Sequence, residues 1–212
     1  MTDAERHVRR SLDKVEDALS ATPFDLGSCQ RSFRDLRERV GRLLEERIPP
    51  TTLSGREWSD ALLKTARADL RAAEALVEKD CPTAVCMLLQ MVFEKLAKAA
   101  LARVDEQRFL ACRRSHAVAS RFVATLRLDP VHWRLHRQWK DVFSVVRMLE
   151  ASHPAITKNG PHLEYPWEDR GRMALPEELP VVREFDDARN PRGVRVLRLA
   201  RELCDRFDEF FQ

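Results

Sequence analysis

The segment from residue 82 to about residue 105 constrains the fold most, because it is strongly apolar and carries one row of polar side chains. Gln90, Glu94 and Lys98 recur every four residues, so on a helix they lie one above another on the same face. A polar group buried without a partner costs roughly 1–3 kcal/mol, so each must find a hydrogen-bond partner or a ligand. The segment therefore predicts a buried helix with a specific polar interaction along one face.

Helix start and stop signals recur along the chain, whereas strand signals are almost absent. Ser54 and Glu57 form a Ser-x-x-Glu capping box, which predicts the start of a helix. Asp129-Pro130 and Asn190-Pro191 are further helix starts. The principal helices are expected at about residues 54–79, 82–105, 130–152 and 191–211, with shorter ones after Ser115 and over 180–188. These signals predict an all-α fold, an antiparallel four-helix bundle with a short cross helix.

The N-terminal 50 residues and the segment over residues 153–180 do not contribute principal helices to this expected bundle. Residues 3–20 and 29–47 carry apolar side chains at helical spacing and end at prolines. They predict an N-terminal helical hairpin over residues 1–50, followed by the bundle over residues 51–212. Residues 153–180 are rich in proline and predict a long loop, and loops of that length are often functional.

Charge and cysteine content bound the function classes. The chain has 37 basic and 34 acidic residues and a formal charge of +3, so its total charge does not indicate a strongly basic nucleic-acid-binding protein. The five cysteines are odd in number and scattered without zinc-site spacing, which favours reduced core thiols, no metal and no cofactor. No apolar run approaches the roughly 18 residues that span a bilayer, so we expect a cytoplasmic protein with no membrane partner.

Four motifs follow one another between residues 58 and 166. They are Trp58–Leu70 with its Asp69-Leu70 pair, Gln90-x-x-x-Glu94-Lys-x-x-Lys98-Ala, Arg114-Ser-His116 and Glu164-Tyr-Pro166. Together they resemble the HEPN family over residues 54–212, where the last two are similar to a Thr-His-Asp and an Arg-Tyr-Pro segment. Ala117 and Glu164 depart from that pattern, because the family often has Asp and Arg at these places. The resemblance implies an HEPN-like bundle.

The resemblance also implies a ligand site and a class of function. Its ligand-binding residues would be Gln90, Glu94, Lys98, His116 and Tyr165. Such bundles serve as nucleotide-binding modules, metal-independent ribonucleases, partners of small nucleotidyltransferases or scaffolds. We therefore expect a dimeric binding module that engages a nucleotide, an RNA or a nucleotidyltransferase partner, in a defence or toxin–antitoxin setting.

A catalytic alternative rests on an Arg-x(4–6)-His motif. Ribonucleases of the HEPN family carry this motif, in which the guanidinium holds the scissile phosphate and the imidazole assists proton transfer. Arg147 and His153 fit with five intervening residues, and Arg127 and His132 fit with four. A chain with this many arginines yields about 2.5 such matches by chance. The candidate catalytic pair is Arg147 and His153, which lie at the end of a predicted helix. The third hypothesis is a protein-interaction scaffold without a ligand.

Structural roles remain open for the same residues. Glu94 precedes Lys98 by four residues, the favourable order for a helix ion pair, and Asp69 could reach Lys95 or Lys98 from the preceding helix. Arginines recur every three residues from 189 to 201, where they either meet RNA or an acidic protein or pair with local carboxylates. Trp133 and Trp139 either stack on bases or pack in the core.

Overall fold

The computed structural model describes residues 53–126, 137–157, 160–186 and 191–212 of the chain. These residues are mostly helical, which confirms the predicted all-α class. The predicted N-terminal hairpin, Arg127, His132 and Trp133 lie outside the described ranges. Within those ranges, no helix combines the length and the apolar character that crossing a membrane requires.

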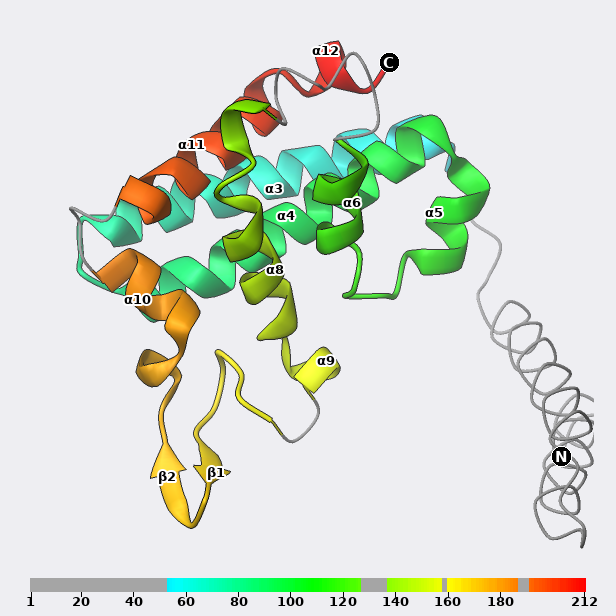
Figure 1. Ribbon diagram of the computed structural model, residues 1–212. Helices are drawn as coiled ribbons and strands as arrows, with labels where there is room; N and C mark the ends of the chain where they lie inside the picture. The colour runs from blue at the N-terminus through cyan, green and yellow to red at the C-terminus, as the bar shows by residue number, and fades with distance from the viewer. Residues whose placement is uncertain (1–52, 127–136, 158–159, 187–190) are drawn as a thin grey trace, which may run out of the picture. The chain divides into compact units, whose positions relative to one another are not determined.

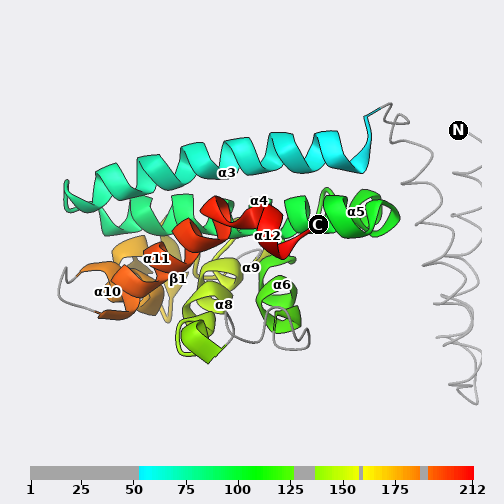
Figure 2. The same cartoon turned by 90° about the horizontal axis from the view of Figure 1, so that it is seen from above.

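Two long antiparallel helices form the frame of the fold. Helix α3 (Gly55–Val77) and helix α4 (Pro82–Val104) lie side by side in both views (Figures 1 and 2). The predicted capping box starts α3, because the Glu57 N–H donates to Ser54 Oγ at 3.3 Å and the Ser54 N–H donates to Glu57 Oε2 at 2.8 Å. Lys95 of α4 forms an ion pair with Asp69 of α3. The capping signal and the Pro82 start thus predicted both helices to within a few residues.

Helix α4 is the centre of the core. Because it is apolar on nearly every side, it must be covered on nearly every side. Helix α3 covers one side, and the shorter helices lie along the opposite side (Figure 2). They are α6 (Ala119–Thr125), α8 (Phe143–Ala151), α10 (Pro180–Asp186) and α11 (Pro191–Asp205), with α12 (Phe207–Phe210) after α11. Leu89, Phe93 and Leu96 of α4 are completely buried beneath them.

The connection after α4 differs from the prediction. A short helix, α5 (Glu106–Cys112), follows directly, because Asp105 accepts a hydrogen bond from the Arg108 N–H at 3.0 Å and so caps its start. Ser115 does not cap the next helix, since its Oγ accepts from the Ala117 N–H at 3.2 Å in a local turn. Helix α6 begins only at Ala119, without a side-chain cap.

The segment over residues 153–180 is not the long loop that its prolines suggested. It contains the single turn α9 (Pro154–Thr157), strands β1 (Trp167–Asp169) and β2 (Arg172–Ala174), and the 3₁₀ turn η1 (Pro176–Glu178). The strands pair antiparallel around Arg170 and Gly171, which have φ values of 52° and 79°. Positive φ at both central residues is what a two-residue hairpin turn of type I′ requires. The hairpin projects from the helices (Figure 1).

The predicted helix over 130–152 is interrupted in the part that is described. Residues 137–139 are helical, a turn follows at 140–142, and α8 covers Phe143–Ala151. Trp139 is buried and its Nε1 donates to Glu202 Oε2 at 2.8 Å. This tryptophan therefore packs in the core instead of offering a face to bases.

Three of the four arginines of α11 are paired with carboxylates of other segments, and Arg198 makes no ion pair with the described residues. Arg192 pairs with Glu184 at 2.7 Å, Arg195 with Asp141 at 2.9 Å and Arg201 with Glu74 at 2.7 Å. Of the two readings left open, the structure favours local ion pairs over a free basic face. These pairs tie α11 to α10, to α3 and to the turn before α8.

The described cysteines are all free thiols. Cys86 and Cys204 are buried in the core, and burial raises the pKa of both, to about 12 for Cys204. Cys112 is half-buried and Cys81 is exposed. The expectation of core thiols thus holds for two of these four residues.

Substitution of Gly55 by Ala is expected to destabilise the protein by about 1–3 kcal/mol. A Cβ at Gly55 would collide with the carbonyl oxygen of Ala102, because the start of α3 lies directly against the end of α4. Urea unfolding measures the change. Gly160→Ala is the matched control, since a Cβ there would lie 3.4 Å from its closest neighbour, the Thr157 carbonyl oxygen. Equal stability of the two variants would contradict the close approach.

Candidate functional site

Gln90, the first residue of the predicted polar row, has a structural partner. Its side chain is buried, and Nε2 donates to the carbonyl oxygen of Leu149 at 2.6 Å. Leu149 lies in the last turn of α8, where backbone carbonyls lack a partner within the helix. Gln90 therefore links the end of α8 to the middle of α4 through this hydrogen bond.

Glu94 uses both of its carboxylate oxygens. Oε1 accepts from Lys98 Nζ at 2.7 Å, and Oε2 lies 2.9 Å from His116 Nδ1. The Glu94 and Lys98 side chains are only 16% and 8% exposed. Burial alone would raise the pKa of Glu94, but the hydrogen bonds from Lys98 and His116 outweigh it and hold that pKa below its ordinary value. Glu94 is thus an ionised, largely buried carboxylate that faces the loop between α5 and α6.

His153 lies between Ser152, the C-cap of α8, and Pro154, the first residue of α9. Its carbonyl oxygen accepts from the N–H groups of Ile156 and Thr157 at 2.8 and 3.0 Å. Its Nδ1 accepts from the Ala155 N–H at 3.1 Å. The Gln90 bond to the end of α8 and these capping bonds together hold the His153 ring in place.

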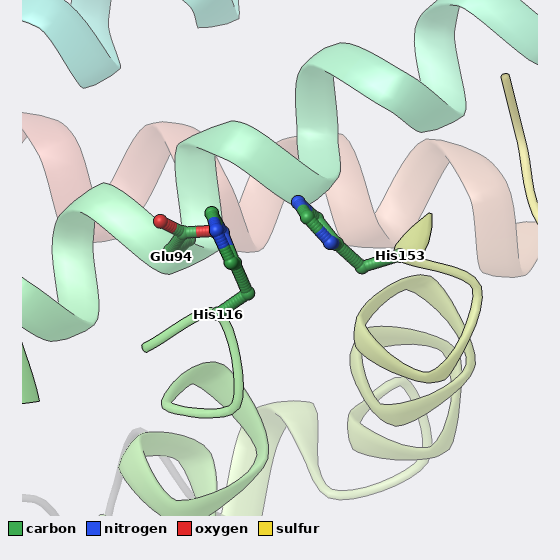
Figure 3. A group of neighbouring side chains, drawn as sticks. All are labelled: Glu94, His116 and His153. Atoms are coloured by element: carbon green, nitrogen blue, oxygen red, sulfur yellow. The ribbon is translucent and has the colours of Figure 1, made fainter. Parts of the chain in front are cut away.

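His116 and His153 come together although 37 positions separate them in the chain. Their rings stack with centroids 4.0 Å apart and planes 18° from parallel. Figure 3 shows the two rings side by side beneath α4, with Glu94 next to His116. We call His116 and His153 the histidine pair. Its two members reach the site from different connections of the fold.

The two imidazoles of the histidine pair have opposite hydrogen-bonding polarity. His116 donates its Nδ1–H to the Glu94 carboxylate, which leaves Nε2 free as an acceptor when the ring is neutral. His153 accepts at Nδ1 from a backbone N–H, so its proton lies on Nε2 when the ring is neutral. The pair thus combines one imidazole acceptor and one imidazole donor.

The pKa of His153 lies below its ordinary value. Burial is the main cause, the neighbouring His116 adds to it, and the carboxylates of Glu94 and Glu164 oppose it. A positive charge on His153 is therefore disfavoured, which favours the neutral form of its ring.

The depressed pKa of His153 predicts a loss of stability in acid. The unfolded chain takes up this proton near the ordinary pKa of 6.5, whereas the folded chain takes it up only at lower pH. Between these two values the unfolded state binds more protons, so stability falls as the pH drops below about 6.5. Urea unfolding at about pH 7 and about pH 5 is expected to show a smaller loss in His153→Asn than in the parent chain. His162→Asn serves as the control, and an unchanged loss in His153→Asn would contradict the assignment.

The donor atoms of Glu94, His116 and His153 lie within 4.8 Å of one another. A zinc ion would need lone pairs of both imidazoles directed at one point about 2.0–2.1 Å from each nitrogen. The lone pair of an imidazole nitrogen lies in the plane of its ring. Because the two rings are stacked and nearly parallel, their lone pairs lie in separate planes and do not point at a common position. The Ala155 N–H also occupies His153 Nδ1, and Lys98 occupies one Glu94 oxygen. This conformation therefore does not fit a metal centre, and the expected absence of a metal stays a prediction.

Two predicted site residues do not join the histidine pair. Arg147 is exposed on α8 and makes no hydrogen bond, ion pair or ring contact with His153. Tyr165 is 63% exposed, its N–H donates to His162 Nδ1 at 3.2 Å, and its ring contacts the His162 ring edge-on. The ring partner of His153 is His116, a pairing that the Arg-x(4–6)-His motif did not indicate.

Neither protein-family models, nor curated proteins, nor solved structures match this chain. The resemblance to the HEPN family consequently rests on the motifs of residues 54–212 alone.

Proposed function

We propose that residues 53–212 form an HEPN-like four-helix module that binds a nucleotide or an RNA at the histidine pair. Helices α3, α4, α8 and α11 would be its principal helices, which accords with α3 and α4 being antiparallel and with α8 and α11 packing on α4. The expected dimer and the expected nucleotidyltransferase partner belong to the same proposal.

One observation carries the proposal: a stacked pair of imidazoles backed by an ionised carboxylate and a buried lysine. A core has no need of four titratable side chains at one place, because each costs free energy to desolvate. An imidazole donates to phosphate oxygens or accepts from the N–H groups of bases, and the pair offers both functions. The His116 side chain is 39% exposed, so a ligand has access to it.

Equilibrium binding of a mononucleotide and of a short RNA tests this proposal. His116→Asn and His153→Asn are each expected to weaken binding at least tenfold, or about 1.4 kcal/mol. His162→Asn is the matched control, because His162 is also half-buried but lies outside the pair. Binding that is unchanged in both variants would exclude the histidine pair as the binding site, and no binding of either probe by the parent chain would favour a scaffold without a ligand.

A second candidate, metal-independent RNA cleavage, is favoured by the opposite polarity of the two rings. Neutral His116 has a free Nε2 that accepts a proton from an attacking hydroxyl group. His153 donates a hydrogen bond from Nε2–H to a phosphoryl oxygen as charge develops there. As the new P–O bond forms, the P–O bond to the leaving oxygen breaks, and that oxygen takes its proton from water. In this version His116 replaces Arg147 as the partner of His153.

RNA cleavage in the presence of EDTA tests the second candidate. We expect cleavage to be lost in His116→Asn and in His153→Asn and to be kept in Arg147→Gln. Loss in Arg147→Gln with retention in His116→Asn would restore the pair that the motif suggested. Cleavage that persists in both histidine variants would remove the histidine pair from the reaction.

A further inference from the structure

The arginines of the described residues fall into two groups. Those in the first group meet carboxylates: Arg103, Arg172, Arg192, Arg195, Arg201 and Arg206. The second group includes the arginines on α5, on α6 and in the loop between them. Because the arginines of the first group are already paired with carboxylates, an anion from solution would have to displace those carboxylates in order to bind.

Residues 107–126 contain four arginines and no acidic residue. We call these four, Arg108, Arg113, Arg114 and Arg121, the arginine patch. Arg108, Arg114 and Arg121 are exposed and Arg113 is half-buried. None of the four guanidinium groups makes an ion pair or a hydrogen bond with the residues that the structure describes. The patch is thus a local excess of positive charge within a chain of nearly balanced total charge.

The arginine patch adjoins the histidine pair. His116 lies in the loop between α5 and α6, within the same twenty residues, and this loop brings it to Glu94 (Figures 1 and 3). The pKa of the half-buried Cys112 thiol responds to these positive charges. Burial raises the pKa of its thiol, while the positive charges of Lys98, Arg108 and Arg121 act against that rise. Lys98 of the site and two arginines of the patch therefore act electrostatically on the same side chain.

The acidic groups near the patch do not cancel it. Asp105 caps α5 through the Arg108 N–H, and Glu150 accepts from the Ser120 N–H at 3.2 Å. Glu106 is exposed in the first turn of α5. Asp105 and Glu150 are thus bonded to backbone N–H groups, and none of these three carboxylates forms an ion pair with a patch arginine among the described residues.

The chemistry of the patch favours phosphate. Guanidinium groups bind phosphate oxygens through paired hydrogen bonds and prefer planar or multidentate anions. One mononucleotide carries too few phosphate groups to engage four arginines on both sides of the His116 loop. A flexible single strand supplies one phosphate per nucleotide, and it also bends enough to place one nucleotide against the largely buried Glu94 and Lys98. A stiff duplex cannot do both.

We infer that the arginine patch binds the phosphodiester backbone of a single-stranded nucleic acid, one nucleotide of which lies at the histidine pair. The inference rests on the proposed function and extends it from a nucleotide to a strand. RNA and DNA strands share this backbone chemistry, and an acidic protein is the competing kind of partner.

The salt dependence of binding tests the inference on the full-length chain. Each phosphate contact on a single strand contributes a slope of about −0.7 to log K against log salt. Four contacts thus predict a slope of about −2.8 for a short RNA strand between about 50 and about 200 mM salt. The double variant Arg114→Gln, Arg121→Gln is expected to reduce the slope by about 1.4 and to weaken strand binding at low salt. Its effect on mononucleotide binding should be small.

The matched control is Arg71→Gln, Arg198→Gln. Both arginines are exposed, lie on α3 and α11, and have no ion pair among the described residues. This control is expected to keep the parent slope. An unchanged slope in the patch variant, or an equal loss in the control, would overturn the inference, and so would equal binding of a duplex or of a polyglutamate.

The outcome also separates this inference from the proposed function. If the histidine variants lose mononucleotide binding while the patch variant keeps full strand binding, the function stands and the inference fails. Parallel titrations with RNA and DNA strands identify the source of the backbone: the predicted slope with either strand supports the inference, and its absence with both overturns it.

Discussion

Substitution of Glu94 by Gln is expected to lower the free energy of unfolding by about 3 kcal/mol, the low end of the range for breaking a buried ion pair. Lys98 is only 8% exposed and donates to the Glu94 carboxylate at 2.7 Å, so it would keep a buried positive charge without a negative partner. His116 would lose its charged partner as well. For a domain of this size the melting temperature should fall by about 6–12 °C.

The controls for Glu94 separate buried from exposed charge. Glu209→Gln breaks the pair between Glu209 and Arg206, whose side chains are 62% and 49% exposed, and should cost less than about 1 kcal/mol. Adding Lys98→Met to Glu94→Gln should restore part of the stability, because an apolar side chain replaces the unpaired charge. Equal effects of Glu94→Gln and Glu209→Gln in thermal unfolding would show that Glu94 behaves as a surface residue. Nucleotide binding measured on the double variant shows whether the Glu94–Lys98 pair also supports the ligand.

Substitution of Phe93 by Ala is expected to destabilise the protein by about 4 kcal/mol, within the range for deleting a buried aromatic side chain. Phe93 lies at the middle of α4, next to Glu94 in sequence, and has no exposed surface. Its removal leaves a cavity beside α4, the helix against which α3, α6, α8, α10 and α11 pack. Urea unfolding measures the change.

Two further variants calibrate the Phe93 effect. Phe93→Leu keeps most of the side-chain volume and should cost less than about 1.5 kcal/mol. Phe210→Ala removes a ring that is only partly buried and should cost clearly less than Phe93→Ala. A loss of less than about 1 kcal/mol in Phe93→Ala would contradict the central place of α4. Phe93→Leu should also keep ligand binding, since Phe93 points into the core.

Local signals in the sequence predicted the frame of the fold closely. The capping box at Ser54 and the proline at 82 act within one helical turn, so their effect does not depend on distant residues. The four-residue spacing predicted the contact between Glu94 and Lys98 for the same reason. The cap at Asp105 was overlooked, although an Asp ahead of Glu106 is a helix start of the same kind.

Weaker local signals were misread. Prolines in residues 153–180 suggested a loop, yet Arg170 and Gly171 close a short hairpin between two of them. Three-residue strands have too few positions for an alternating pattern to emerge. The balanced total charge likewise concealed the arginine patch, which a count over twenty residues would have revealed.

The candidate site is formed by residues that are far apart in the sequence. The sequence offered His153 a partner six positions away, Arg147, because a motif describes near neighbours. In the fold His153 meets His116 instead, through the end of α8, the Gln90 bond to Leu149 and the loop after α5. No spacing rule connects positions 116 and 153.

By itself the sequence determined the helical class, the two long helices and the polar row on the second, since each follows from interactions within a few residues. Only the tertiary structure decided which polar residues have structural partners and which come together at the candidate site. Gln90 donates a hydrogen bond to a carbonyl oxygen of α8, Lys95 forms an ion pair with Asp69, and Trp139 packs in the core. The physical reason is that a side chain's partners depend on which helices pack against it, and packing is settled by burying the apolar surface of the whole chain rather than by any single segment.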